Sequence, residues 1–232
     1  MRYDFGPGSK PAPALRPITG RTATTNNIND EMSDTKVLRV GEDVPQFELE
    51  TYNPTHGEFG RFSLDEARHA SKWTVLVFYP ADFTFVCPTE LADLAEKHAQ
   101  LKELGCEVVA VSTDTKFAHL AWRNSERLLA SVKYLMAADP TGRISRLFGV
   151  YDEASGLALR GTFVISPTGK LVSSEVNFYN VGRDADELVR KMEANTYLAV
   201  HPDQACPAKW KPGSKTLTPN AKMVGKVYEA LQ

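Results

Sequence analysis

The chain has 232 residues, enough for one large domain or two small ones. Hydrophobic residues make up 42% and charged residues 24%, which is typical of a globular protein with a sizeable core. A formal net charge of −2 gives no electrostatic indication of a nucleic acid or an anionic membrane as partner. The longest apolar runs, such as residues 75–79, are far shorter than the ~20 residues that cross a bilayer. We therefore expect no nucleic acid partner and no membrane association.

The cysteine content indicates one or two reactive thiols in a reducing compartment. Cys87, Cys106 and Cys206 are too few for a disulfide scaffold, and no C-x-x-C pair is present. None of the five histidines has metal-ligand spacing from a cysteine pair, so zinc is not expected. No apolar signal segment follows Met1. These features predict a cytoplasmic protein without metal or cofactor.

Residues 1–34 differ in composition from the rest of the chain. They contain several prolines and glycines and show neither a helix nor a strand period. We interpret this segment as a disordered or loosely docked N-terminal arm, and Met32-Ser33-Asp34 would be a plausible native start. The arm is then an extension from a mis-assigned start or a cloning remnant. Its arginines and threonines allow a transit peptide, against which Asp4 and the prolines argue.

Residues 35–199 show alternating strand and helix patterns. The predicted elements, in chain order, are strands at 47–51, 59–63 and 73–79, a helix at 88–104, a strand at 106–112, a helix at 117–129, a strand at 132–136, a small helix at 139–148, a hairpin at 161–166 and 170–178, and a helix at 184–198. This order predicts an α/β fold with a central mixed sheet flanked by helices. The proline-rich segment 200–232 is a separate tail, which we expect to pack against a partner subunit.

Cys87 lies where the strand 73–79 has ended and the next helix begins. Pro88 suits the first helical position because its missing N–H would be unpaired there. Unpaired backbone N–H groups and the helix dipole at this end favour an anion, and therefore the thiolate over the thiol. An isolated cysteine is more often an inert buried residue. Its position at a helix start favours a reactive nucleophile instead.

The residues around Cys87 indicate which reaction it performs. Residues 80–90, Pro-Ala-Asp-Phe-Thr-Phe-Val-Cys-Pro-Thr-Glu, resemble the active-site loop of peroxiredoxins, with the pattern P-x-x-x-T-x-x-C. Similarity continues from about Val37 to Lys226, including the segments 117–122 and 159–165. The segment 201–210 is similar to the second-cysteine segment of the typical two-cysteine branch, of the bacterial alkyl hydroperoxide reductase C type. The resemblance implies a thioredoxin-like fold and a thiol peroxidase that reduces hydrogen peroxide and organic hydroperoxides.

The resemblance also implies roles for five residues of the site. Cys87 would attack a peroxide oxygen and become a sulfenic acid. Thr84 would hydrogen-bond the reacting atoms through its hydroxyl, and Arg160 would stabilise the thiolate and the leaving oxygen. Pro80 would shape the loop and shield the thiolate from water. Glu90 would orient the arginine rather than touch the substrate.

Cys206, 119 residues beyond Cys87, is identified by the resemblance as the resolving thiol. It would attack the sulfenic acid to give a disulfide, which in this branch joins two subunits of a homodimer, with dimers assembling into a decameric ring. The implied reductant is a flavin-dependent reductase or thioredoxin. Cys106, at the start of a core strand, is predicted to serve packing, as are His119 and Trp122 on one helix, by packing or hydrogen bonding.

Two other functions use the same features. A holdase chaperone or peroxide sensor would depend on ring assembly or on a relayed disulfide rather than on turnover. A thioredoxin-like disulfide reductase would need a C-x-x-C pair at the helix start, where this chain has Thr84 and Glu90 three residues on either side of Cys87.

The chain also lacks the Gly-Gly-Leu-Gly loop and the C-terminal Tyr-Phe of members that excess peroxide inactivates. We therefore predict that Cys206 captures the sulfenic acid before a second oxidation.

Overall fold

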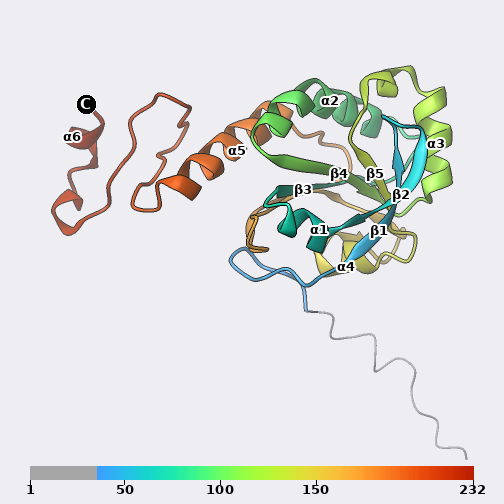
Figure 1. Cartoon of the computed structure of the whole chain (residues 1–232), viewed down its shortest axis with the longest axis horizontal. Coiled ribbons are helices and arrows are strands. Elements are labelled where there is room, and N and C mark those ends of the chain that lie inside the picture. Colours follow the sequence, from blue (N-terminus) through green and yellow to red (C-terminus); the bar gives the residue numbers. More distant parts are fainter. Residues whose placement is uncertain (1–35) are drawn as a thin grey trace, which may run out of the picture. The chain divides into compact units, whose positions relative to one another are not determined.

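The computed structural model describes residues 36–232, so the predicted arm at 1–34 lies outside the described residues. Its centre is a seven-stranded sheet in the order β2-β1-β5-β4-β3-β8-β9 (Figure 1). The strands are β1 (Glu48–Asn53), β2 (Glu58–Ser63), β3 (Trp73–Phe78), β4 (Cys106–Ser112), β5 (Leu135–Ala138), β8 (Arg160–Ile165) and β9 (Leu171–Asn177). The inner strands β3, β4 and β5 are parallel, and the outer pairings are antiparallel. The sheet is therefore mixed, as predicted.

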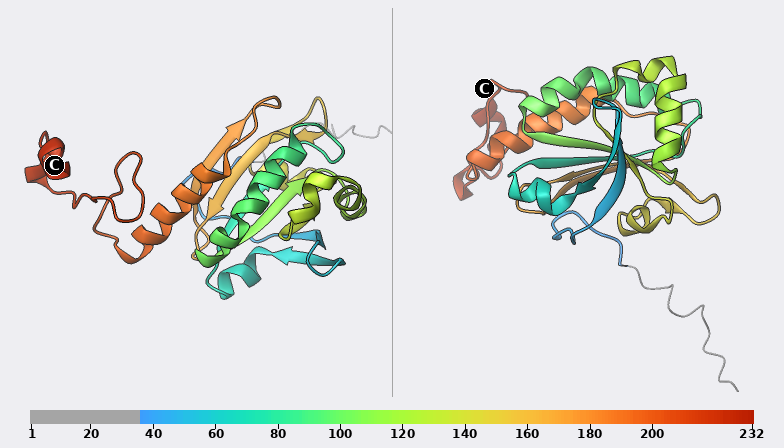
Figure 2. Two further views of the ribbon diagram at one scale, coloured as in Figure 1. Left: turned by 90° about the horizontal axis from the view of Figure 1, so that it is seen from above. Right: turned by 45° about the vertical axis from the view of Figure 1, so that its right-hand side comes forward.

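Helices cover both faces of this sheet, as Figures 1 and 2 show. On one face lie α2 (Cys87–Glu103), α3 (Lys116–Ser125) and α5 (Ala185–Val200); on the other lie α1 (Leu64–His69) and α4 (Arg143–Leu147). Strand β3 supplies both cores because successive side chains of a strand point to opposite faces. Val75 and Val77 pack in the α2 and α5 core, whereas Leu76 and Phe78 pack in the α1 and α4 core. This explains the nearly continuous apolar run of that strand.

The segment after β4 differs from the prediction. The helix predicted at 117–129 is interrupted, because α3 ends at Ser125 and a 3-10 helix, η1, spans Arg127–Ser131. Glu126 has extended backbone between them, and its carboxylate accepts a hydrogen bond from the Leu128 N–H. The strand predicted at 132–136 is β5, which begins later, at Leu135. Val132 and Tyr134 are both buried, so the sequence alternates like a strand here, although the pairing of β5 begins only at Leu135.

Smaller elements were not predicted at all. Helix α1 has six residues, and the two-residue strands β6 (Tyr151–Asp152) and β7 (Leu157–Ala158) form a separate hairpin. Elements this short carry too few residues to show a hydrophobic period. The thioredoxin-like arrangement does not depend on them, and the other predicted strands and helices are present with their ends displaced by a few residues.

The tail after α5 folds around one tryptophan. Trp210 is 3% exposed, and its ring lies 5.0 Å from that of Tyr197 on α5. A bridge between Ala205 and Leu217 closes the intervening loop, and η2 (Ala221–Met223) and α6 (Val227–Leu231) follow. The tail thus uses the last turns of α5 as its packing surface, at the C-terminal end of the ribbon in Figure 1.

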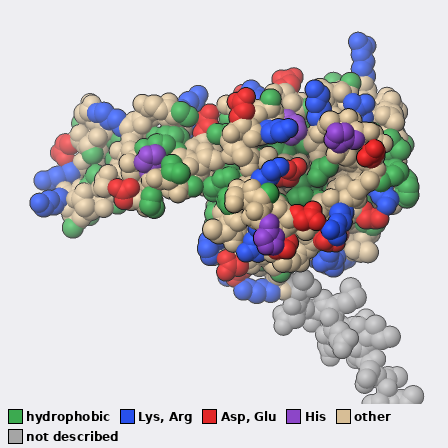
Figure 3. All heavy atoms as spheres, in the orientation of Figure 1, with side chains coloured by type: hydrophobic (Ala, Val, Ile, Leu, Met, Phe, Trp, Pro, Cys, Tyr) green, Lys and Arg blue, Asp and Glu red, His purple; other side chains and the backbone are tan. Residues whose placement is uncertain are grey.

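The described surface carries charges of both signs. Basic and acidic side chains are interspersed over the face shown in Figure 3. No helix within residues 36–232 is long and apolar enough to span a membrane. The mixed charge agrees with the near-neutral balance of the sequence.

Candidate active site

Cys87 is the first residue of α2, at the end of the loop that follows β3. Pro88 occupies the next helical position, and Val86 supplies no side-chain hydrogen bond to cap the helix. The Cys87 thiol therefore occupies a helix N-terminus whose N–H groups lack a side-chain acceptor. Cys87 is fully buried, and Pro80 at the start of the loop is buried as well. Water is kept from the sulfur in this arrangement.

Arg160, the first residue of β8, brings a positive charge to this thiol. Its Nη1 donates to Cys87 Sγ at 3.4 Å and to Glu90 Oε2 at 2.5 Å. Its Nε donates to the Tyr179 carbonyl at 2.7 Å. The guanidinium is thus held from two sides, and only 4% of the Arg160 side chain is exposed. A permanently charged group fixed beside the sulfur stabilises the thiolate electrostatically.

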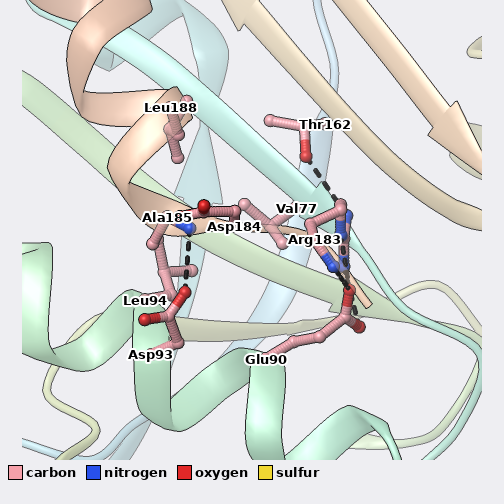
Figure 4. Close-up of a pocket in the computed structure, with 9 residues that line it drawn as sticks. All are labelled: Val77, Glu90, Asp93, Leu94, Thr162, Arg183, Asp184, Ala185 and Leu188. Carbon is pink, nitrogen blue, oxygen red and sulfur yellow. Dashed lines mark hydrogen bonds and ion pairs between the residues drawn. The ribbon is translucent and has the colours of Figure 1, made fainter. Parts of the chain in front are cut away.

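Glu90 lies one turn after Cys87 on α2 and joins two arginines. Besides Arg160, it binds Arg183, whose Nε and backbone N–H both donate to Oε1, at 2.8 and 2.9 Å. Arg183 also donates to the Gly161 carbonyl at 2.7 Å and to the Thr162 hydroxyl at 3.3 Å, and thereby ties the carboxylate to the start of β8. Figure 4 shows its contacts with Glu90 and Thr162. Two buried guanidinium groups around one buried carboxylate leave a net positive charge next to the thiol. Glu90 is thus hydrogen-bonded to both Arg160 and Arg183.

The sequence-based prediction missed Arg183. It precedes α5, separated from Glu90 by 93 positions, and a charged residue before a helix is ordinarily solvated. Asp184, its neighbour, caps α5, and Asp93 of α2 accepts from the Ala185 N–H at 2.8 Å. These contacts between α2 and the start of α5, drawn in Figure 4, place Arg183 against Glu90. Only the short Gly-Arg-Asp run before the predicted helix could have drawn attention to it.

Thr84 lies in the same loop, and its hydroxyl faces the backbone. Thr84 Oγ1 donates to the Ala81 carbonyl at 2.8 Å, and no hydrogen bond joins it to Cys87 among the described residues. Because its one hydrogen is engaged, the oxygen has only its lone pairs to offer. A hydroperoxide O–H could therefore donate a hydrogen bond to Thr84. A peroxide oxygen that accepts from Thr84 would first have to replace the Ala81 carbonyl as the acceptor.

Cys206 lies in the tail and makes no contact with Cys87 within the described part of the chain. The tail loop presents it partly exposed, and all three cysteines are free. Burial raises the pKa of the Cys206 thiol, while the nearby charge of Arg190 on α5 acts in the opposite direction. The structure thus brings Arg160 and Glu90 to Cys87, places Pro80 and Thr84 in the loop that precedes it, and leaves Cys206 apart.

Three further predictions concerned residues outside the reacting group. Cys106 is buried, and burial raises its pKa to about 12, so that it stays an unreactive thiol at neutral pH. His119 is fully buried with hydrogen bonds to both ring nitrogens, and Trp122 is 1% exposed. All three serve packing or hydrogen bonding, as expected. No group of three or more His, Cys, Asp or Glu within residues 36–232 could hold a metal ion.

The sequence and the fold of the chain match those of known proteins. The family model "AhpC/TSA family" matches residues 40–174. The chain belongs to this family. It is 47% identical over 188 residues to alkyl hydroperoxide reductase C of Bacillus subtilis, covering 81% of this chain and 98% of the relative. It is 49% identical over 172 residues to alkyl hydroperoxide reductase C of Escherichia coli K12, covering 74% and 91%.

Solved structures of two similar proteins share the fold. Enterococcus faecalis AhpC matches with a TM-score of 0.68 and 46% identity, over 72% of this chain and 98% of that one. The reduced 2-Cys peroxiredoxin of Plasmodium vivax matches with a TM-score of 0.75 and 30% identity, over 80% and 98%. The predicted family, the thioredoxin-like fold and the class of thiol peroxidase are confirmed.

Proposed function

We propose that this AhpC/TSA family member reduces hydrogen peroxide and small organic hydroperoxides through Cys87. The observation that supports this most directly is the 3.4 Å contact between Arg160 Nη1 and the buried Cys87 sulfur at the start of α2. Helix N–H groups and a guanidinium together favour a thiolate, the form that attacks a peroxide. The relatives named alkyl hydroperoxide reductase C support the same substrate class.

The first step forms a sulfur–oxygen bond and breaks the oxygen–oxygen bond. The Cys87 thiolate attacks the terminal oxygen of ROOH, the sulfur is oxidised to a sulfenic acid, and RO⁻ leaves and takes a proton as ROH. Arg160 stabilises the charge that develops on the leaving oxygen, because it is already oriented by Glu90 and by the Tyr179 carbonyl. Thr84 accepts a hydrogen bond from the hydroperoxide O–H, and Pro80 keeps water from the sulfur.

The second step removes the sulfenic acid. The Cys206 thiolate attacks the Cys87 sulfur, a disulfide forms, and the hydroxyl group leaves as water after taking a proton. We propose that Cys206 comes from the partner subunit of a homodimer. In support, the tail that carries Cys206 is anchored on α5 through Trp210 and makes no contact with Cys87 of its own chain within residues 36–232.

The cycle needs two electrons from another protein to restore the thiols. We propose a flavin-dependent reductase or thioredoxin as this partner, dimers assembled into a decameric ring, and a cytoplasmic location, in which free thiols persist. Antioxidant defence and redox homeostasis follow from such a cycle. We also propose that the chain divides into an N-terminal arm at 1–34, a peroxidase domain at 35–199 and a C-terminal segment at 200–232 that carries Cys206.

Stopped-flow mixing of the reduced protein with peroxide tests the function. We expect rapid second-order oxidation of wild type and none in Cys87→Ser, with Cys106→Ser as the matched control that retains the wild-type rate. Equal peroxide consumption by Cys87→Ser and wild type would overturn the assignment of the nucleophile. Slow oxidation of wild type, together with suppression of aggregation of a client protein, would favour the chaperone or sensor alternative.

A further inference from the structure

The loop between β9 and α5 holds Arg160 through a second nitrogen of its guanidinium group. Arg160 Nη1 donates to Glu90 and to the Cys87 sulfur, whereas Nε donates to the Tyr179 carbonyl at 2.7 Å. A guanidinium group is planar, so its direction is defined once two of its nitrogens are held. Glu90 is held in turn by Arg183, but the Tyr179 carbonyl belongs to a loop outside the strands and helices. The direction of Arg160 therefore depends on what holds Tyr179.

The side chain of Tyr179 is bound by the β6–β7 hairpin. Its hydroxyl donates to Asp152 Oδ2 at 2.7 Å and lies 2.9 Å from the hydroxyl of Ser155. Ser155 also donates to Asp152 Oδ2 at 2.7 Å, so the three side chains form a closed group of hydrogen bonds. Tyr179 is thus fixed at two points, because its carbonyl binds Arg160 and its hydroxyl binds the hairpin.

Asp152 and Tyr179 are in the protonation states that this group needs. Hydrogen bonds from Tyr179, and next from Ser155, lower the pKa of Asp152, so it is a carboxylate at neutral pH. Burial raises the pKa of Tyr179, and Asp152 raises it further against the effect of Ser155, so the hydroxyl keeps its hydrogen. Tyr179 therefore donates to a charged acceptor, which makes the hydrogen bond stronger than one between neutral groups.

The hairpin is itself anchored, and it leads directly into Arg160. Arg146 of α4 donates to both carboxylate oxygens of Glu153 in the hairpin, at 2.6 and 3.0 Å, and to the Thr141 carbonyl at 2.8 Å. Only Leu159 separates the end of β7 from Arg160. A closed path of contacts thus runs from Arg160 through the loop after β9 to the hairpin and back along the chain.

We propose that Tyr179, with Asp152 as the acceptor of its hydroxyl, is a positioning residue that aims the Arg160 guanidinium at Cys87. Both residues act through Arg160, because neither contacts the sulfur among the hydrogen bonds of residues 36–232. Without the hydroxyl, the loop can shift, the Arg160 Nε bond loosens, and Nη1 moves relative to the sulfur. A small misplacement of a catalytic group is enough to slow a reaction. The effect on turnover rests on the proposed function, in which Cys87 attacks peroxide.

Stopped-flow oxidation of the reduced protein by hydrogen peroxide tests the proposal. Tyr179→Phe keeps the ring and removes only the hydroxyl, so oxidation of Cys87 should slow about three- to tenfold. Asp152→Ala should slow it by a similar factor, and Asp152→Asn, which keeps an acceptor oxygen, should recover part of the rate. Tyr151→Phe is the matched control in the same hairpin and should keep the wild-type rate. The Tyr151 hydroxyl forms no hydrogen bond with Tyr179, Asp152 or Arg160 in the described part of the chain.

A double-mutant cycle separates positioning of Arg160 from a general loss of structure. In an Arg160→Met background, Tyr179→Phe should change the oxidation rate less than about twofold, because the group through which Tyr179 acts is absent. A merely structural role would slow both backgrounds by the same factor. A second readout is the ultraviolet absorbance of the Cys87 thiolate in a Cys106→Ser, Cys206→Ser background. In an acid-to-neutral titration, this absorbance should appear at higher pH in Tyr179→Phe than in the same background with Tyr179 intact.

Two results would overturn the proposal: a Tyr179→Phe variant with the wild-type rate and thiolate titration, or equal slowing in both backgrounds of the cycle. Failure of the proposed peroxidase function would appear separately, as slow oxidation of the wild type by peroxide. The thiolate titration uses no peroxide. An upward shift of the titration in Tyr179→Phe together with slow oxidation of wild type would therefore support the positioning of Arg160 and reject the peroxidase.

Discussion

Arg160 donates to the Cys87 sulfur across 3.4 Å, although 73 positions separate the two residues in the chain. The contact joins the start of α2 to the start of β8, and β8 pairs with β3, the strand that leads into the Cys87 loop. The sheet pairing therefore sets the distance between Cys87 and Arg160. The consequences of this relationship can be measured.

Replacing Arg160 by Met should slow oxidation of Cys87 about 10²-fold or more, because a preorganised cation beside the developing charge is removed. Arg160→Lys keeps the charge but loses the guanidinium fork between the sulfur, Glu90 and the Tyr179 carbonyl, and it should recover only part of the rate. Stopped-flow measurement with hydrogen peroxide gives both values. A Met variant as fast as wild type would show that the helix N-terminus alone activates the thiol.

Glu90→Gln should destabilise the fold by about 3–5 kcal/mol, since it leaves Arg160 and Arg183 buried without their shared carboxylate. Urea unfolding monitored by circular dichroism measures this difference. Glu187→Gln is the matched control, because Glu187 is 43% exposed in its pair with Arg190, and its loss should cost less than about 1 kcal/mol. Equal effects of the two variants would contradict the buried cluster as a source of stability.

Cys206→Ser should abolish the disulfide of the oxidised protein while Cys87 still reacts with peroxide. On non-reducing electrophoresis, we expect oxidised wild type at dimer size and oxidised Cys206→Ser at monomer size. Cys106→Ser should behave as wild type, since Cys106 is buried in the core. An oxidised wild type that runs only at monomer size would contradict the assignment of the disulfide to two subunits.

Cys106 should contribute to alkaline unfolding. Its pKa is raised to about 12 in the folded chain, whereas a cysteine in an unfolded chain titrates near ~8.5. Above that lower value the unfolded state binds fewer protons, so stability is lost as pH rises toward 12, by up to ~1.4 kcal/mol per pH unit. Cys106→Ala should show a shallower decline in urea unfolding between about pH 9 and 11. An identical slope would mean that the thiol ionises without unfolding.

Wild type should resist inactivation by excess peroxide. The chain lacks the glycine-rich loop of sensitive members, with no glycine between Gly105 and Gly142. We expect mass spectrometry to find little sulfinic Cys87 during turnover at low peroxide excess, and much more in Cys206→Ser, which cannot resolve the sulfenic acid. Abundant sulfinic Cys87 in wild type would show that Cys206 captures the sulfenic acid too slowly.

Local sequence determined most of the fold and the position of Cys87 in it. The apolar run of β3, the helical spacing of α2 and the Pro88 that starts it are set by neighbouring residues, so Cys87 could be placed at a helix start from the sequence. The break at Glu126 and the late start of β5 could not be placed, because a cap hydrogen bond and a strand partner decide them.

Tertiary structure alone decided how the site is assembled. Arg183 was not predicted, since a charged residue before a helix becomes a buried partner only when Glu90, 93 positions away, is brought against it. Likewise, the sequence predicts that His119 packs or forms hydrogen bonds, but its position says nothing of Asp82 in the Cys87 loop as the partner. The physical reason is the same in both cases: a buried charge needs a partner, and partners from distant segments meet only when the sheet and its helices have packed. The sequence determined the position of Cys87 at a helix start, and the packed fold determined which charges surround it.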